Sequence, residues 1–303
     1  MATTLARTFT FTGPLDLRRT MLPLQRGMGD PTMLVGDREV WRATRTSGGP
    51  ATLHLTLEAD RLVAEAWGPG ADETLESASG WAGLQDDDRG FRPRHRVVKD
   101  LHRRLRGVRL TRTGRPTEAL IPAVLEQKVT GREARDAFRR LVLKYGAPAP
   151  GPAPEGMCVP PSAEAWRHVP SWDWHRAGVD PKRSRTICLA MRCASRLEQA
   201  VGMAPDDAAR RLSAVPGIGV WTVAEIAQRA LGDSDALSVG DYHLSNVVGS
   251  TLLGHRIDDD EMLELLEPLR PHRFRAVRLL EVSGLARNPR FGARMAIPNL
   301  RAL

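Results

Sequence analysis

Apolar and polar residues alternate along much of the first ninety positions, which is the spacing typical of β-strands. Phe9 and Phe11 alternate with threonines, a short helical segment follows Pro14, and strand-like segments cover 40–46, 52–57 and 61–67. Glycine and proline follow the first of these three segments, and an acidic turn follows the second. The pattern predicts an antiparallel sheet in a β-rich N-terminal domain, residues 1–95.

Beyond residue 95 the apolar positions recur every three or four residues, the spacing typical of helices. Thr130 and Glu133 form a capping box at the start of one of them. Helices are expected at 118–127, 131–145, 162–166, 182–200, 205–214, 220–231, 241–253, 258–268 and 271–283. The predicted fold class is therefore α+β: an N-terminal antiparallel β-sheet domain followed by a mainly α-helical body, residues 96–303. The basic tail at 288–303 is expected to pack on the surface.

The composition is that of a soluble globular protein, with 42% apolar and 26% charged residues. No apolar run approaches the length of a membrane span, and the N-terminus lacks the apolar stretch of a signal peptide. The three cysteines do not make a disulfide framework or a four-thiolate metal site. Cys188 and Cys193 lie on an apolar-periodic helix and are expected to be buried thiols.

The formal net charge is +8, and it is concentrated in one stretch. Residues 92–115 hold ten Lys or Arg residues against one acid, Asp100. An apolar stripe through the same stretch favours an ordinary solvated helix face opposite the arginines. The overall basicity nevertheless favours a polyanionic partner, of which nucleic acid is the commonest.

A glycine turn joins two predicted helices at Pro216-Gly217-Ile218-Gly219. The glycines leave the backbone uncovered, so successive N–H groups can converge on an anion at the start of the following helix. A phosphate diester fits such a site without a side-chain cation, which matters because residues 203–250 hold six carboxylates and three arginines. An ordinary helix–turn–helix connection is the alternative interpretation of this turn.

The hairpin and the residues after it resemble a known family. Leu212 to Thr222 and then Val239-Gly240-Asp241-Tyr242 are similar to the motif of the helix–hairpin–helix–Gly/Pro–Asp DNA glycosylases, and most similar to the AlkA-like 3-methyladenine DNA glycosylase II branch. A second similar stretch covers 118–146. The resemblance assigns the hairpin to 205–231 and the catalytic loop to 232–242.

By this resemblance Asp241 is the catalytic aspartate. Base excision passes through an oxocarbenium-like sugar, whose charge a carboxylate stabilises, or whose attacking water it orients. A helix N-cap is the alternative role for Asp241, and both roles are compatible. The resemblance also assigns DNA backbone binding to Pro216, Gly217, Ile218, Gly219 and Thr222.

Lyases of the family use a lysine at the position that Trp221 occupies here, so the resemblance implies an enzyme with no lyase activity. Trp221 and Tyr242 are then expected to form aromatic walls around a flipped purine, with core packing as the alternative for Trp221. Glu225 and Glu281 replace aromatic residues of the family's base pocket. They are expected either to recognise a cationic base or amine, or to face solvent.

Gln127 and Lys128 stand where the family places residues in the gap that a flipped base leaves in the DNA stack. A lysine at such a position either occupies the gap or holds a phosphate, and it intercalates less well than the family's apolar wedge.

The sequence therefore predicts a monofunctional glycosylase of base excision repair that removes damaged purines by base flipping, with alkylated purines as the expected class. The alternatives are a glycosylase for deaminated or bulky adducts and a non-catalytic DNA-binding protein. The expected partner is double-stranded DNA, with no membrane and a monomeric chain. No cofactor and no side-chain metal are expected, although the resemblance implies a monovalent cation at the hairpin. The expected location is cytoplasmic, at the bacterial nucleoid.

Overall fold

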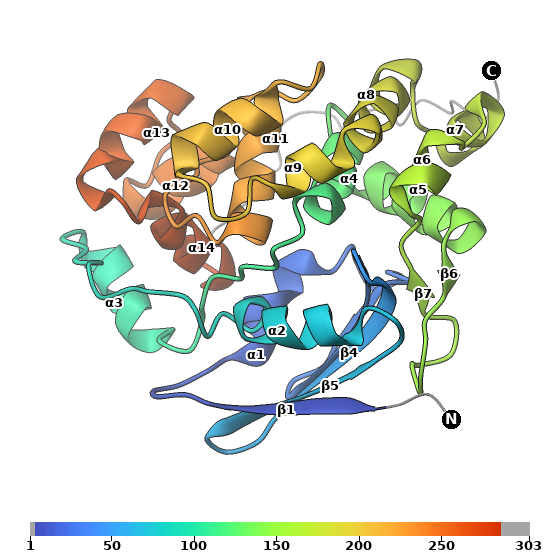
Figure 1. The fold of residues 1–303 in the computed structure, drawn as a ribbon. Coiled ribbons are helices and arrows are strands. Elements are labelled where there is room, and N and C mark those ends of the chain that lie inside the picture. Colours follow the sequence, from blue (N-terminus) through green and yellow to red (C-terminus); the bar gives the residue numbers. More distant parts are fainter. Residues whose placement is uncertain (1–3, 286–303) are drawn as a thin grey trace.

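The computed structural model describes residues 4–285. It confirms the predicted α+β class: an antiparallel sheet comes first in the chain, and helices make up most of the described residues after it (Figure 1). The predicted packing of the tail at 288–303 lies outside the described residues. Within those residues, no helix has the length and apolar character needed to cross a bilayer.

Five strands form the N-terminal sheet, and each pairs antiparallel with its neighbours in the order β1-β5-β4-β3-β2. Their bounds are β1 Leu5–Thr10, β2 Met33–Val35, β3 Glu39–Thr46, β4 Gly49–Leu57 and β5 Arg61–Trp67. The three consecutive strands predicted from alternation are β3, β4 and β5. The turn between β3 and β4 brings Thr46 opposite Gly49, where φ is +128°, a conformation that favours glycine.

A helix that the alternation did not predict packs on this sheet. The helix α2 (Ala71–Trp81) buries Leu75, Ala78 and Trp81, which recur every three residues and join the apolar side chains of the sheet in one cluster. Small residues and serines fill much of its sequence, so its apolar periodicity is weak. The short α1 (Leu17–Met21) and η1 (Leu22–Leu24) follow β1 and enter the same cluster.

The helical body follows the predicted order of elements with two differences. The predicted helix at 182–200 is broken at Cys193, and a short helix at 171–177 was not predicted. The elements are α3 (Arg96–Arg104), α4 (Pro116–Leu125), α5 (Gly131–Tyr145), β6 (Ala147–Pro148), β7 (Cys158–Val159), α6 (Ala163–Arg167), α7 (Ser171–Ala177), α8 (Pro181–Arg192), α9 (Ala194–Glu198), α10 (Pro205–Ser213), α11 (Val220–Ile226), η2 (Ala227–Leu231), α12 (Leu244–Leu252), α13 (Asp259–Leu266), η3 (Glu267–Leu269) and α14 (Arg273–Val282).

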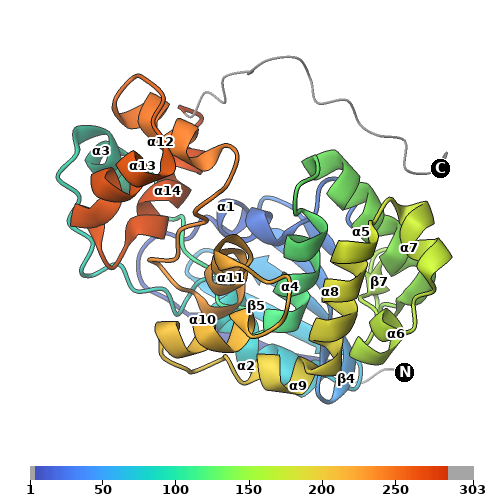
Figure 2. The ribbon, with the colours of Figure 1, turned by 90° about the horizontal axis from the view of Figure 1, so that it is seen from above.

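The helical body contains two large apolar clusters. One is built from α4 to α11, and the other combines α3 with α12, α13 and α14. Seen from above, α3 lies beside the C-terminal helices, apart from α4, α5 and α8 (Figure 2). The arginine-rich α3 buries Val98 and Leu101 in the second cluster, as its apolar stripe predicted. The domain boundary at residue 95 stays a prediction.

The cysteine thiols are less buried than the sequence predicted. Cys158, Cys188 and Cys193 are free thiols of intermediate exposure. Cys188 and Cys193 pack at the edge of the first helical cluster rather than inside it, because the buried face of α8 is formed by Ile187, Ala190 and Met191.

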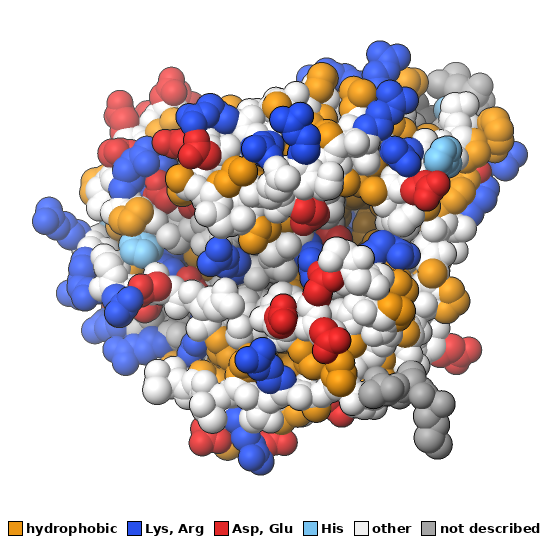
Figure 3. Space-filling model, in the orientation of Figure 1, with side chains coloured by type: hydrophobic (Ala, Val, Ile, Leu, Met, Phe, Trp, Pro, Cys, Tyr) orange, Lys and Arg blue, Asp and Glu red, His pale blue; other side chains and the backbone are white. Residues whose placement is uncertain are grey.

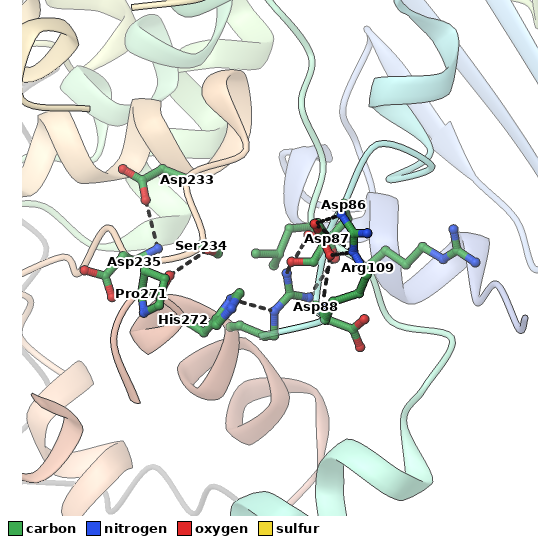
Figure 4. A network of polar contacts seen from close by, with 12 residues as sticks. Asp86, Asp87, Asp88, Arg109, Asp233, Ser234, Asp235, Pro271 and His272 are labelled. Atoms are coloured by element: carbon green, nitrogen blue, oxygen red, sulfur yellow. Dashed lines mark hydrogen bonds and ion pairs between the residues drawn. The ribbon is translucent and has the colours of Figure 1, made fainter. Parts of the chain in front are cut away.

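A buried ion pair fastens the segment after α2 to the C-terminal helices. Both carboxylate oxygens of Asp86 accept from Arg275, at 2.6 and 2.7 Å, and one also accepts the backbone N–H of Leu110. Figure 4 shows Asp86, Asp87 and Asp88 on one side of this contact and His272, at the start of α14, on the other. Burial and the neighbouring Arg275 lower the pKa of His272. The ring therefore stays neutral beside the guanidinium at neutral pH.

Glu118 fastens the sheet to the helical body. Its carboxylate accepts from the Arg42 guanidinium at 2.9 Å, from the Thr44 hydroxyl at 2.6 Å and from the backbone N–H of Arg45 at 2.9 Å. All three donors lie on β3, whereas Glu118 lies in the first turn of α4, where a carboxylate also complements the helix dipole. The Arg42 and Glu118 side chains are only 8% and 13% exposed.

We expect Glu118→Ala to lower the free energy of unfolding by about 3–5 kcal/mol, because it leaves the Arg42 guanidinium buried without its partner. Urea denaturation followed by circular dichroism measures the change. Glu58→Ala is the control: it breaks an exposed ion pair with Arg61 and should cost less than about 1 kcal/mol. Equal losses in the two variants would contradict the linking role of Glu118.

Candidate active site

Asp241 lies in the loop that joins η2 to α12, and its carboxylate is held by three N–H donors. One oxygen accepts the backbone N–H groups of His243, at 2.8 Å, and Leu244, at 3.1 Å. These bonds satisfy donors at the start of α12, as an N-cap aspartate does. The other oxygen accepts from the indole Nε1 of Trp221 at 3.0 Å. The side chain is therefore fixed in orientation.

Two turns bring Asp241 to this place. Gly232 ends η2 with φ +71°, and Gly240 adopts φ +84° directly before the aspartate. Asp259, in the first turn of α13, accepts the backbone N–H of Gly240 at 2.7 Å. The loop is thus held by α11 through Trp221 and by α13 through Asp259.

Asp241 opens onto a cavity of about 340 Å³, which is large enough for a small organic ligand. Its walls come from the N-terminal segment, the strand-like stretch before α4, and the helices α11, η2, α12 and α14. The lining residues are Thr20, Pro23, Arg109, Leu110, Thr111, Glu225, Gln228, Arg229, Ser238, Asp241, His243, Leu244, Val247, Phe274, Val277, Arg278 and Glu281. Phe274 is the one Phe, Trp or Tyr among these described lining residues.

The predicted pocket residues Glu225 and Glu281 both line this cavity. Glu225 is buried, accepts from the Ser238 hydroxyl at 2.6 Å, and pairs with Arg229 at 2.8 Å. Glu281 lies nearer the mouth, with its side chain 43% exposed, and pairs with Arg278 at 3.1 Å. The cavity is therefore walled by paired charges. Glu225 is buried in this wall, whereas Glu281 lines the cavity with an exposed side chain.

Burial and charge act against each other on these side chains. Desolvation raises the pKa of Glu281, while Arg278 opposes that change. Burial acts to lower the pKa of Arg229, but Glu225 and the other carboxylates around it raise the pKa above its usual value. Arg229 is therefore a fixed cation in the wall.

The two predicted aromatic walls are placed differently from each other. Trp221 is half-buried on α11 and contacts Asp241, but it is not among the residues that line the cavity. Tyr242 is 73% exposed, with its ring edge against His243 at a centroid distance of 4.8 Å. Tyr242 also lies outside the cavity lining. The indole N–H contact of Trp221 was not predicted by the sequence.

The hairpin between α10 and α11 presents Pro216, Gly217 and Gly219 at the surface, with Ile218 buried beneath them. Gly217 adopts φ +94°, and a Cβ there would lie 2.1 Å from the Thr186 hydroxyl, so this turn requires glycine. Gly219 has φ −99°, and a Cβ there would meet no protein atom within 4 Å. The fold therefore does not require glycine at position 219. Because Gly219 has no side chain, the surface at the start of α11 stays uncovered.

Gln127 and Thr222 support the hairpin from inside. The Gln127 amide donates to the Gly217 carbonyl at 3.0 Å and to the Thr222 hydroxyl at 2.9 Å. Thr222 is buried, so it contacts Gln127 and does not reach the surface. Lys128, the next residue after Gln127, is exposed with φ +55°, a conformation that L-residues seldom adopt. Lys128 therefore projects from the tight turn between α4 and α5, next to the residue that holds the hairpin.

Several cavity residues were missed from the sequence although a signal was present. Phe274 and Arg278 recur at helical spacing with the predicted Glu281, and this spacing places one face of α14 in the cavity wall. Arg109 comes from the basic stretch, whose arginines were expected to be solvated. Within residues 4–285 no group of three or more His, Cys, Asp or Glu side chains is arranged to hold a metal ion.

Comparison with curated proteins finds a partial sequence match. No family model matches the chain. A stretch of 140 residues is 34% identical to the probable bifunctional transcriptional activator/DNA repair enzyme AlkA of Mycobacterium tuberculosis. This match covers 46% of the chain and 28% of the relative, so the chain spans well under half the length of the curated protein.

Solved structures show the fold class. The 3-methyladenine DNA glycosylase from Archaeoglobus fulgidus matches with a TM-score of 0.72 at 16% identity, covering 91% of this chain and 97% of that one. MBOgg1 in complex with a low-affinity DNA ligand matches with 0.70 at 13% identity, covering 92% and 96%. The 8-oxoguanine glycosylase/lyase of Clostridium acetobutylicum, bound to double-stranded DNA, matches with 0.61 at 12% identity, covering 82% and 96%.

The chain therefore has the fold of the DNA glycosylases. The 140-residue match to AlkA agrees with the resemblance of the hairpin motif to the AlkA-like branch.

Proposed function

We propose that the chain is a monofunctional DNA glycosylase of base excision repair that hydrolyses the bond between a damaged purine and its deoxyribose. The observation that carries the proposal is the placement of Asp241: a carboxylate held by three N–H donors opens onto a cavity of about 340 Å³, with a glycine hairpin on the helix beside it. The partner is double-stranded DNA. We further propose a cytoplasmic monomer that acts at the nucleoid.

The reaction follows from this arrangement. The damaged nucleotide leaves the stack and its base enters the cavity. As the bond between C1′ and the base nitrogen breaks, the electron pair leaves with the base and positive charge develops on the sugar. Asp241 stabilises this charge and orients the water that adds to C1′, which leaves an abasic site. Trp221 is a positioning residue, because it contacts the carboxylate and not the base.

The proposed substrates are alkylated purines. The curated relative is named as a DNA repair enzyme and the Archaeoglobus fulgidus structure as a 3-methyladenine DNA glycosylase. Alkylation at a ring nitrogen makes a purine cationic, and the cavity offers Glu225 and Glu281 to such a base. The alternative of deaminated or bulky adducts rests on the same two glutamates, since paired acids and arginines can also bind a neutral base through hydrogen bonds.

The hairpin is proposed to dock a DNA phosphate through backbone N–H groups at the start of α11, which has no capping side chain. Docking through backbone N–H groups needs no side-chain cation, which matters because the surrounding surface is locally acidic. The same proposal includes a monovalent cation at the hairpin. It also places Lys128 in the gap left by the flipped base or on a phosphate near that gap. Gln127 would act indirectly, by holding the hairpin.

Asp241→Asn keeps the shape of the side chain and removes its charge, so we expect it to slow base release by about 100-fold or more. The measurement is the count of abasic sites in a duplex with one methylated purine. Asp60→Asn, an exposed turn residue of the sheet, is the matched control and should release the base at the wild-type rate. Equal rates for Asp241→Asn and wild type would remove Asp241 from the mechanism. If the protein binds duplexes but releases no base from a broad panel of lesions, the alternative of a non-catalytic DNA-binding protein is favoured.

Gly219→Ala should weaken binding to all duplexes alike, by about 10-fold, because its methyl group blocks an approach to phosphate and not to a base edge. The free protein has room for this methyl group, so its unfolding midpoint should stay unchanged. Fluorescence anisotropy with duplexes of several sequences measures binding. A loss confined to one sequence would contradict phosphate docking.

Borohydride should trap no covalent adduct between the protein and damaged DNA. Trp221 stands where the family's lyases have lysine, and no lysine lines the described part of the cavity. The readout is the absence of a slow-migrating band on a denaturing gel, with the Clostridium acetobutylicum glycosylase/lyase and its own substrate as the positive control. A strong band with this chain would show that another amine attacks the sugar.

A further inference from the structure

A second and larger cavity, of about 540 Å³, lies between the sheet and the helical body. Its walls come from the end of β3, from α2, from the start of α4 and from α9. Figure 3 shows this face of the molecule hollowed, with Lys/Arg and Asp/Glu side chains gathered around the depression. Only Arg229 lines both this cavity and the one at Asp241. None of the residues proposed for base excision or DNA docking lines it.

Cations outnumber acids in its walls. The five arginines are Arg26, Arg42, Arg45, Arg115 and Arg229, and the three acids are Glu73, Glu118 and Glu198. The acids are already bound by the protein. Glu118 is held by β3, and Glu73 accepts from the Ser47 hydroxyl and the backbone N–H of Gly48. Carboxylates outside the lining pair two of the arginines, Arg26 with Glu126 at 3.3 Å and Arg229 with Glu225 at 2.8 Å. Arg45 and Arg115 are therefore the guanidinium groups that carboxylates compensate least.

Two of these arginines have buried donors that remain unused. The Nε atoms of Arg42 and Arg115 are buried and have no hydrogen-bond partner among residues 4–285. Arg42 is only 7% exposed, so its Nε lacks water as well. Arg115 has one loose ion pair, with Glu73 at 3.8 Å. The Arg115 guanidinium is therefore compensated by the protein less firmly than that of Arg42, which Glu118 binds at 2.9 Å.

Arg45 adds a further guanidinium to the lining. The Arg45 side chain has one weak contact, from its Nε to the Pro160 carbonyl at 3.3 Å. The helix α4 begins at Pro116 with no side-chain N-cap of its own, and Glu198 from α9 accepts the backbone N–H of Thr117 at 3.0 Å. Glu198 thus already occupies the positive end of this helix, so Arg45 and Arg115 are the groups left for an anion.

The lining also contains apolar and aromatic side chains, namely Trp81, Phe138, Trp166, Ile121 and Met191, and the Arg42 guanidinium lies over the Trp81 ring at 5.5 Å. The cavity thus combines guanidinium groups with apolar surface, and its volume lies within the range typical of small-molecule sites. A lone inorganic anion would leave the apolar surface unfilled. A ligand that fills both has one anionic group and an aromatic body.

From this arrangement we infer that the cavity binds a small aromatic anion of nucleotide size, with its phosphate or carboxylate on Arg45 and Arg115 at the start of α4 and its rings against the apolar surface. This site is separate from the base pocket and does not depend on the proposed glycosylase activity.

Isothermal titration of the full chain with a nucleoside monophosphate, the matching nucleoside, inorganic phosphate and benzoate tests the inference. We expect the monophosphate or benzoate to bind more tightly than the nucleoside or phosphate alone. Arg115→Gln should weaken that binding by about 10- to 100-fold, the effect of losing a hydrogen bond to a charged group. Arg140→Gln, an exposed arginine of α5 outside the cavity, should bind as wild type does.

A second variant guards against a failure of Arg115→Gln to fold. Ser195→Trp places bulk at the exposed rim of the cavity without removing a charge, and it should also reduce binding. Asp241→Asn should bind the anion as wild type does, which separates this site from the base pocket.

Three results would overturn the inference. They are no detectable binding of any of the four probes, unchanged binding by both Arg115→Gln and Ser195→Trp, and displacement of the bound anion by undamaged duplex DNA. The last result would assign the anion to the DNA surface.

Discussion

The helix α4 is the constraint on which the arrangement of the site depends. At its N-terminal end Glu118 is bound by three donors of β3, and after its C-terminal end Gln127 donates to the hairpin carbonyl and to Thr222. The ten residues of α4 therefore set the distance between the sheet and the hairpin. Its apolar residues are almost all buried, so the helix cannot slide without losing its core contacts. The sheet supports the hairpin through this one rigid element.

The cavity at Asp241 is lined by more charged than aromatic side chains, whereas the sequence predicted aromatic side chains that stack on the base. Phe274 is the one Phe, Trp or Tyr in its described lining, whereas three arginines and three acids surround the space. Paired charges in a partly desolvated wall act more strongly than they do in water, so they can orient a base without an aromatic face. Trp221 donates its indole N–H to Asp241, and Trp221 is not among the described residues that line the cavity.

The sequence predicted the parts whose signal is local. Alternation predicted β3 to β5, helical spacing predicted most of the body, and the residues from Pro216 to Asp241 identified the hairpin and the aspartate. The helix α2 was missed because small residues weaken its periodicity. The break at Cys193 was missed because neither glycine nor proline marks it. Where the structure contradicts an expectation, as for the half-buried cysteines, the outcome depends on which face of a helix finds a neighbour.

The roles around the site were harder to predict, since they depend on contacts between distant segments. Gln127 and Thr222 are 95 residues apart, and Trp221 and Asp241 are 20 apart. A motif can place such residues near DNA, but it cannot say which of them face inward. The exposure of Tyr242 and the burial of Thr222 are therefore results of the packing and could not be predicted from spacing.

The walls of the Asp241 cavity come from all three large apolar clusters of the described residues. Thr20 follows Leu17 in the sheet cluster, Glu225 precedes Ile226 in the first helical cluster, and Phe274 belongs to the cluster that includes α3. No single cluster encloses the space, so the pocket exists only while the three remain docked. Its shape therefore depends on all three clusters together. Local opening of any one cluster would remove the pocket before the whole molecule unfolds.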